Sequence, residues 1–133
     1  MKKSIGFICV GNSCRSQMAE GFAKKLGKNV FEVYSAGTEP AVKVNPNAVE
    51  VMKEAGIDIT DQKPKVLKDI PNKLDIIITM GCNVQCPFVP HDHKEDWGLD
   101  DPVGKPIEEF RKTRDTIQKK MHDLIRRVQQ GEV

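Results

Sequence analysis

A cysteine and an arginine six positions apart are the residues of this sequence best suited to chemistry. Cys9 is followed by five residues, then by Arg15 and Ser16. The planar guanidinium of Arg15 can bind two oxygens of a tetrahedral oxyanion, and positive potential there lowers the pKa of the Cys9 thiol and makes it nucleophilic. The Ser16 hydroxyl is placed to donate to that sulfur. The pattern predicts an oxyanion site with a nucleophile at its base; the alternative is a glycine-containing turn beside a buried cysteine.

The elements on either side of this motif favour the oxyanion site. Residues 4–9 are predicted to form a buried strand, and a helix capped by Ser16 and ended by Gly27 follows the motif. A loop that wraps onto a helix N-terminus directs several backbone N–H groups at one point, where the helix dipole adds positive potential. The predicted oxyanion-binding residues are Val10, Gly11, Asn12, Ser13, Cys14, Arg15 and Ser16.

Strand patterns alternate with helix patterns along the rest of the chain. Strands are predicted at 30–35 and 74–79, and helices from Asn45 to Gly56 and over 106–129. The segment 81–106 is predicted to be irregular, because it is rich in proline. The alternation predicts an α/β fold with a parallel sheet covered on both faces. Ligands of such sheets bind at the carboxyl ends of the strands, so the cysteine-bearing segments after two of these strands are expected at the same edge.

Length and composition exclude several classes of protein. The chain has 133 residues, enough for one domain, 1–133, with its own core. Lys and Arg number 21 against 19 Asp and Glu, and aromatic residues make up 5%, so a nucleic-acid binder is not expected. No apolar run approaches the ~20 residues of a membrane helix, and no signal peptide is recognisable. We expect a cytoplasmic protein whose four cysteines serve the core, a metal site or redox chemistry rather than structural disulfides.

Three segments of the sequence resemble a known family. The segments CVGNSCRSQMAE at 9–20, YSAGT at 34–38 and DWGLDDP at 96–102 are similar to thioredoxin-coupled arsenate reductases, which share the low-molecular-weight protein tyrosine phosphatase fold. The resemblance implies a single three-layer domain with a four-stranded parallel sheet flanked by helices. It also implies Cys9 as nucleophile and Asp101 as general acid, with the loop held in shape by Asn12, Ser16, Glu20 and Ser35.

A second cysteine pair distinguishes a reductase from a phosphatase. Reduction of arsenate needs two electrons, so a second thiol must attack the Cys9 adduct and a third must carry the disulfide to a reductant. Cys82 and Cys86 suit these two roles, with thioredoxin as the expected donor and arsenate as the substrate. The resemblance implies neither a metal nor an organic cofactor. The gap of three residues between these cysteines is shorter than in well-known relatives.

Two other functions use the same residues. A tyrosine phosphatase needs only Cys9, Arg15 and Asp101, although phosphatases of this fold usually carry aromatic residues beside the acid, where this chain has Val103 and Gly104. A zinc- or arsenic-binding sensor would use Cys82, Cys86, His91 and His93. In the favoured interpretation both histidines are exposed loop residues.

Two further expectations concern residues around the loop. Cys14 is expected to be a small buried side chain. Lys65 falls near the position where some relatives hold potassium with an acidic residue, so we predict no potassium site. We expect a monomer.

Overall fold

The frame of the molecule is a sheet of four parallel strands in the order β2-β1-β3-β4. The computed structural model describes residues 2–81 and 89–133. The strands are β1 (Lys3–Cys9), β2 (Phe31–Gly37), β3 (Leu74–Thr79) and β4 (His91–Asp96). Cys9 pairs with Gly37, and Ile8 pairs with Thr79, so the carboxyl ends of β1, β2 and β3 lie together at one edge. This confirms the predicted four-stranded parallel sheet.

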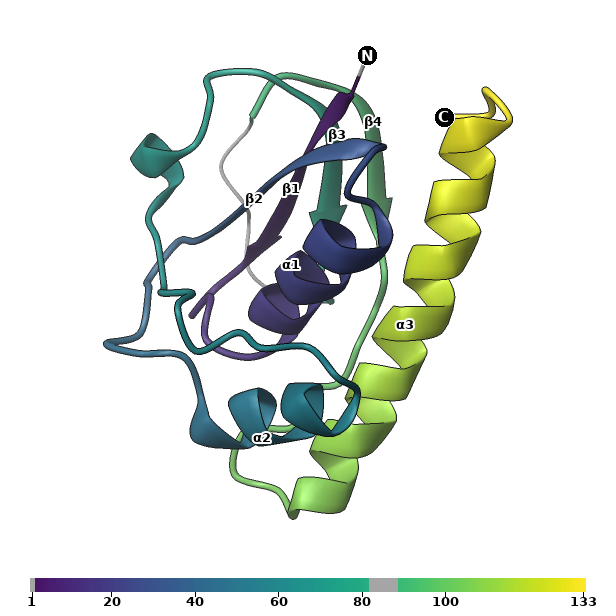
Figure 1. The fold of residues 1–133 in the computed structure, drawn as a ribbon. Coiled ribbons are helices and arrows are strands. Elements are labelled where there is room, and N and C mark those ends of the chain that lie inside the picture. The colour runs from purple at the N-terminus through teal and green to yellow at the C-terminus, as the bar shows by residue number, and fades with distance from the viewer. Residues whose placement is uncertain (1, 82–88) are drawn as a thin grey trace.

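In the described part of the chain, three helices and one short 3₁₀ helix accompany the sheet (Figure 1). They are α1 (Arg15–Leu26), α2 (Pro46–Glu54), α3 (Ile107–Gln129) and the 3₁₀ helix η1 (Leu67–Asp69). The predicted start of α2 is confirmed: the Asn45 side chain caps it by accepting from the Asn47 N–H at 2.9 Å, and Pro46 takes the first position. None of the helices within 2–81 and 89–133 is long and apolar enough to cross a membrane.

The core is divided by the sheet, because successive side chains of a strand point to opposite faces. Alternate residues of β1 and β3 join the helices in the larger cluster, which includes Ile5, Phe7, Met18, Phe22, Met52, Ile76, Ile78, Phe110, Ile117 and Met121. The other face carries a smaller cluster of Ile8, Ala36, Ile70, Leu74 and Ile77. Burial of β1 and β3 on both faces explains their continuous apolar sequences.

The segment 81–106 contains a strand where the sequence predicted irregular structure. The sequence of β4, HDHKED, carries no apolar residue, and its exposure alternates between half-buried and exposed positions. Among the described residues it pairs only with β3, at the edge of the sheet, where charged side chains are typical. His91 and His93 are therefore half-buried strand residues rather than exposed loop residues: His91 Nδ1 lies 2.6 Å from the Val89 oxygen, and His93 Nε2 lies 2.7 Å from Glu95 Oε2.

Two boundaries also differ from the prediction. The first helix begins at Arg15 with Cys14 in the cap position, so Ser16 lies inside the first turn and does not cap it. Its hydroxyl instead faces the Cys9 sulfur. The second strand extends through Gly37, because Ala36 and Gly37 continue the pairing with Ile8 and Cys9.

Candidate active site

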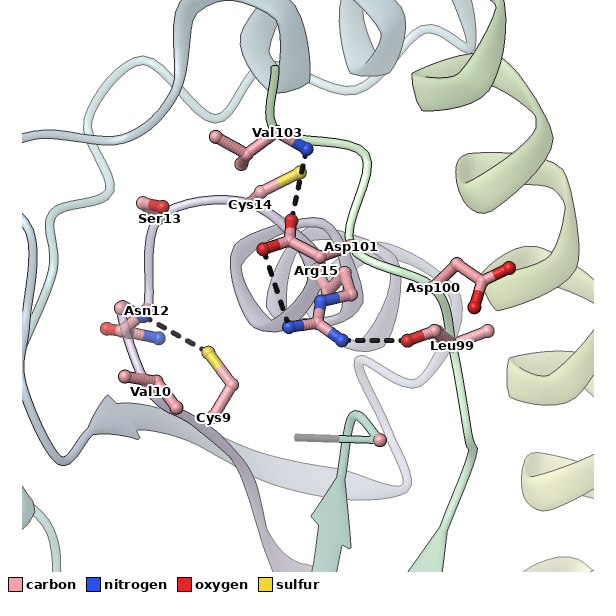
Figure 2. A pocket seen from close by; sticks show the side chains of 12 residues that line it. Cys9, Val10, Asn12, Ser13, Cys14, Arg15, Leu99, Asp100, Asp101 and Val103 are labelled. Carbon is pink, nitrogen blue, oxygen red and sulfur yellow. Dashed lines mark hydrogen bonds and ion pairs between the residues drawn. The ribbon is translucent and has the colours of Figure 1, made fainter. Parts of the chain in front are cut away.

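The loop between β1 and α1 forms one wall of a pocket of about 620 Å³ (Figure 2). Its lining comes from three parts of the chain: residues 9–15, Gly81 after β3, and Leu99, Asp100, Asp101 and Val103. β1 ends at Cys9 and α1 begins at Arg15. The two side chains that the sequence analysis selected therefore lie on the same short loop. Cys82 and Cys86 lie outside the described residues.

A backing segment, residues 38–45, binds the outer side of the loop. The N–H groups of Thr38, Glu39, Ala41 and Asn45 donate to the carbonyls of Cys9, Val10, Gly11 and Ser13 at 3.1, 2.9, 2.9 and 2.7 Å. In a trans peptide the C=O and the following N–H point in opposite directions. The N–H groups of the loop residues that follow these carbonyls are therefore turned away from the backing segment. Sequence reasoning used only the ends of this segment, Thr38 in a family-like motif and Asn45 as a helix start, and did not predict that it binds the loop.

Gly37 allows the backing segment to approach so closely. A Cβ at this position would lie 2.4 Å from the Val10 carbonyl oxygen and 3.1 Å from Asn12. Such a contact forces the backbone to shift, so only glycine fits between β2 and the loop at this point.

The sulfur of Cys9 lies at the base of the pocket and is buried. It accepts a hydrogen bond from the Asn12 N–H at 3.1 Å, and the Ser16 hydroxyl oxygen lies 2.9 Å away. Such contacts favour the charged form of a sulfur over its thiol. The arrangement can hold a nucleophilic thiolate facing the pocket.

Asn12 gives the loop its shape. Its φ of 49° is the only positive φ of a non-glycine residue in the described part of the chain, and this left-handed conformation costs free energy that surrounding contacts must offset. The side chain is fully buried. Its Oδ1 accepts from the Lys65 N–H at 2.8 Å and from Gln17 Nε2 at 3.0 Å, and its Nδ2 donates to Ser16 Oγ at 2.8 Å.

Arg15 joins the loop to the opposite wall of the pocket. Its Nη1 donates to the Met80 carbonyl at 2.8 Å and to the Leu99 carbonyl at 2.7 Å, while Nη2 lies 3.9 Å from Asp101 Oδ2. The side chain is 10% exposed, against 55% for Asp101. The two backbone carbonyls hold the planar group against the pocket, as Figure 2 shows for Leu99.

Asp101 stands at the mouth of the pocket. Its Oδ1 accepts a hydrogen bond from the Val103 N–H at 3.1 Å, which forms a turn around Pro102. Its Oδ2 faces Arg15. Both carboxylate oxygens are thus oriented, yet the group remains accessible to solvent. A carboxyl group in this position can exchange protons with water and with a bound ligand.

Glu20 and Ser35 are buried and form an ionic cluster with the partly exposed Lys24 and Lys65. Glu20 accepts from the Ser35 hydroxyl, from Lys24 Nζ at 2.6 Å and from Lys65 Nζ at 3.1 Å. Burial is the largest influence on this carboxyl and raises its pKa, but the hydrogen bonds from Lys24 and Ser35 and the charges of Lys65 and Lys24 together bring the pKa below its ordinary value. The Lys65 ammonium therefore supplies positive charge directly beside Glu20.

Cys14 contrasts with Cys9 although both belong to the loop. Burial and the charge of Asp101 raise the pKa of Cys14 to about 12, against the opposing charge of Arg15. Cys14 therefore stays a thiol at neutral pH, in keeping with a small buried side chain. In the described part of the chain, no three histidine, cysteine or acidic side chains are grouped as metal ligands.

Comparison with known proteins identifies the family. The low molecular weight phosphotyrosine protein phosphatase family matches residues 4–133. The arsenate reductase of Brevibacillus brevis is 52% identical over 120 residues, which are 87% of this chain and 89% of that protein. A solved arsenate reductase in the phosphate-binding state has a TM-score of 0.88 and 40% identity, over 96% of this chain and 99% of that one. The thioredoxin-dependent arsenate reductase of Corynebacterium glutamicum has a TM-score of 0.79 and 31% identity, over 98% of this chain and 63% of that one. The chain therefore belongs to the low molecular weight phosphotyrosine protein phosphatase family, in the branch that contains these arsenate reductases.

Proposed function

We propose that this protein reduces arsenate to arsenite. The observation that carries the proposal is the buried Cys9 sulfur at the base of a pocket, with Arg15 beside it and Asp101 at the mouth. The arsenate reductases among its relatives, at 52% identity and at a TM-score of 0.88, support arsenate as the oxyanion. The amides of the loop and the guanidinium of Arg15 bind the arsenate oxygens.

The first step is attack of the Cys9 thiolate on arsenic. A sulfur–arsenic bond forms, one arsenic–oxygen bond breaks, and Asp101 gives its proton to the departing oxygen, which leaves as water. Arsenic is still pentavalent in this adduct. The distance of 3.9 Å between Arg15 Nη2 and Asp101 Oδ2 supports a proton donor beside the group that binds the oxyanion.

The second and third steps move electrons from thiols to arsenic. The Cys82 thiolate attacks the Cys9 sulfur, a disulfide forms, and the sulfur–arsenic bonding pair stays on arsenic, which leaves as arsenite. Cys86 then attacks the Cys82 sulfur, which releases Cys9 as a thiolate and leaves a Cys82–Cys86 disulfide. The three-cysteine cycle draws both electrons from protein thiols and requires no metal or organic cofactor.

The reductant that reopens the Cys82–Cys86 disulfide is proposed to be thioredoxin. The likeness to a thioredoxin-dependent arsenate reductase of Corynebacterium glutamicum supports this choice. Such a cycle requires a compartment that keeps thiols reduced, and we therefore propose that the protein acts in the cytoplasm, as a monomer.

Weak phosphatase activity is a second, subordinate proposal. The family match and the shared set of Cys9, Arg15 and Asp101 favour it. The pocket mouth, however, carries the half-exposed Val103 followed by Gly104, which offer an aryl ring no aromatic partner. We therefore expect aryl phosphates to be poor substrates.

A coupled assay tests the proposed function. The purified protein is supplied with arsenate, thioredoxin, thioredoxin reductase and NADPH, and arsenite is quantified alongside NADPH oxidation. Para-nitrophenyl phosphate hydrolysis is measured in parallel. Arsenite formation that depends on both enzyme and thioredoxin supports the proposal, whereas aryl phosphate hydrolysis without arsenite formation would make the protein a phosphatase.

A further inference from the structure

A continuous series of side-chain hydrogen bonds leads from the half-buried Gln62 to the Cys9 sulfur. Gln62 Nε2 donates to Gln17 Oε1 at 2.8 Å, and Gln17 Nε2 donates to Asn12 Oδ1 at 3.0 Å. Asn12 Nδ2 then donates to Ser16 Oγ at 2.8 Å, and Ser16 Oγ lies 2.9 Å from Cys9 Sγ. Each group that accepts from the one before donates to the one after.

Backbone groups fix the direction of this series, because they show which end of each amide carries nitrogen. Gln62 Nε2 also contacts the Gln17 carbonyl at 3.0 Å, and Gln17 Nε2 also contacts the Asn12 and Lys63 carbonyls at 3.0 Å. A carbonyl oxygen can only accept, so each of these atoms is a donor. The Lys65 N–H can only donate, so the Asn12 atom 2.8 Å from it is the oxygen.

The direction of these hydrogen bonds determines what Ser16 can donate to Cys9. Ser16 Oγ accepts from Asn12 Nδ2, so its own hydrogen remains available for the Cys9 sulfur. The sulfur then accepts from Ser16 and from the Asn12 N–H. Hydrogen bonds aligned head to tail polarise one another and are stronger than isolated ones.

We propose that Gln17 is a positioning residue that orients the Asn12 amide, and through Ser16 stabilises the Cys9 thiolate, with Gln62 as the outer support. The inference rests on the proposed role of Cys9 as nucleophile. Gln17 is fully buried and makes its contacts behind the loop. Neither glutamine lines the pocket, where the titratable groups that line it with Cys9, among residues 2–81 and 89–133, are Arg15, Cys14, Asp100 and Asp101. Changing the glutamines therefore leaves those groups in place.

The test measures the pH dependence of Cys9 alkylation by iodoacetamide in the reduced protein without arsenate. Fragment-ion mass spectrometry separates Cys9 from Cys14, which lies on the same tryptic peptide. Gln17→Met keeps the side-chain size but removes the donor, and should raise the midpoint by about 0.5–1 pH unit, the effect of one lost hydrogen bond. Gln62→Met should raise it less, and Gln118→Met on α3 is the matched control with no shift.

The double variant distinguishes a series from separate structural effects. If Gln62 acts through Gln17, adding Gln62→Met to Gln17→Met produces no further shift, whereas independent effects add. An unchanged midpoint in folded Gln17→Met, or additive shifts, would overturn the proposal. If Gln17→Met does not fold, an unshifted midpoint of Cys9 alkylation in Gln62→Met would overturn the proposal. A shift in a protein that forms no arsenite would instead contradict the proposed function and leave the series standing.

Discussion

The two walls of the pocket are built in opposite ways. On the loop side, Asn12, Ser16 and Gln17 are fully buried and their polar atoms are hydrogen-bonded in several directions. On the other side, Asp101 is 55% exposed and its described contacts are one N–H at 3.1 Å and one ion pair at 3.9 Å. A nucleophile gains from a fixed environment that stabilises its charge, whereas a general acid must recover its proton from water in every cycle.

Arg15 is the link between the walls. It belongs to the buried loop, yet its Nη1 hydrogen bonds end on the Met80 and Leu99 carbonyls across the pocket. In the proposed mechanism, anchoring Arg15 on both sides keeps the Cys9 sulfur and the Asp101 carboxyl group at a constant separation. Substitutions in the two walls should therefore lower activity to different extents. A substitution of Arg15 should affect both walls.

The largest effect is expected for Cys9→Ser. A serine hydroxyl lacks the thiolate that Asn12 and Ser16 stabilise, so arsenate reduction should fall at least about 1,000-fold. Arsenite formation measures the loss, and a thermal unfolding curve within a few degrees of wild type shows that the fold is intact. Turnover near the wild-type rate would exclude Cys9 as the nucleophile.

Arg15→Lys should follow, with kcat/KM reduced about 100- to 1,000-fold. Lysine keeps the positive charge but cannot bind two ligand oxygens in one plane while donating to two backbone carbonyls. Arg111→Lys is the matched control, because Arg111 pairs with Glu54 on the surface between α2 and α3. Equal kinetics for the two variants would mean that Arg15 acts only as a charge.

Asp101→Asn tests the open wall and should lower kcat about 100-fold, since an amide cannot supply the proton. Arsenate binding should change little, because the loop is untouched. Asp100→Asn is the control, as Asp100 lines the same pocket and is also exposed. A larger loss of kcat in Asp100→Asn than in Asp101→Asn would indicate that Asp100, not Asp101, is the general acid.

The smallest effect on catalysis is expected at Glu95, at the base of the segment that carries Asp101. The hydrogen bond from Arg127 is the largest influence and, with His93 and Trp97, lowers the pKa of Glu95 to about 2 against the opposing effect of burial. A depressed pKa contributes stability above the ordinary value near 4.5 that is lost as the pH falls towards 2. Glu95→Gln should therefore lower the free energy of unfolding by about 1 kcal/mol at pH 7. The deficit should shrink in acid, and kcat should stay within about twofold. A constant deficit across pH would contradict the ion-pair explanation.

Sequence patterns predicted the parts of the fold that depend on burial and on local turn chemistry. β1 and β3 are apolar on both faces, and Asn45 with Pro46 begins α2 through its own side chain, so each carries its signal locally. β4 carries no such local signal in its sequence, because its place at the sheet edge is decided by pairing with β3 alone. The short helix η1 and the extension of β2 to Gly37 depend in the same way on neighbours that are distant in the sequence.

The site was predictable to the extent that one motif contains it. Cys9, Arg15 and Ser16 lie within eight residues, whereas Asp101 required a family resemblance. Gln17 was missed because a single glutamine in a helix pattern is usually a surface residue. Its importance arises from Gln62 and Lys63, more than 40 residues away, which no pattern joins to it.

The proposed thiol cycle is tested most directly by Cys86→Ser. This variant retains Cys9 and Cys82 but has no third thiol, so it should release about one arsenite per protein and then stop as a Cys9–Cys82 disulfide. Mass spectrometry of the protein after a single exposure to arsenate, digested without reductant, identifies that linkage. We expect the trapped disulfide together with a single turnover. Repeated turnover of Cys86→Ser with thioredoxin at the wild-type rate, with no Cys9–Cys82 linkage accumulating, would contradict the proposed cycle.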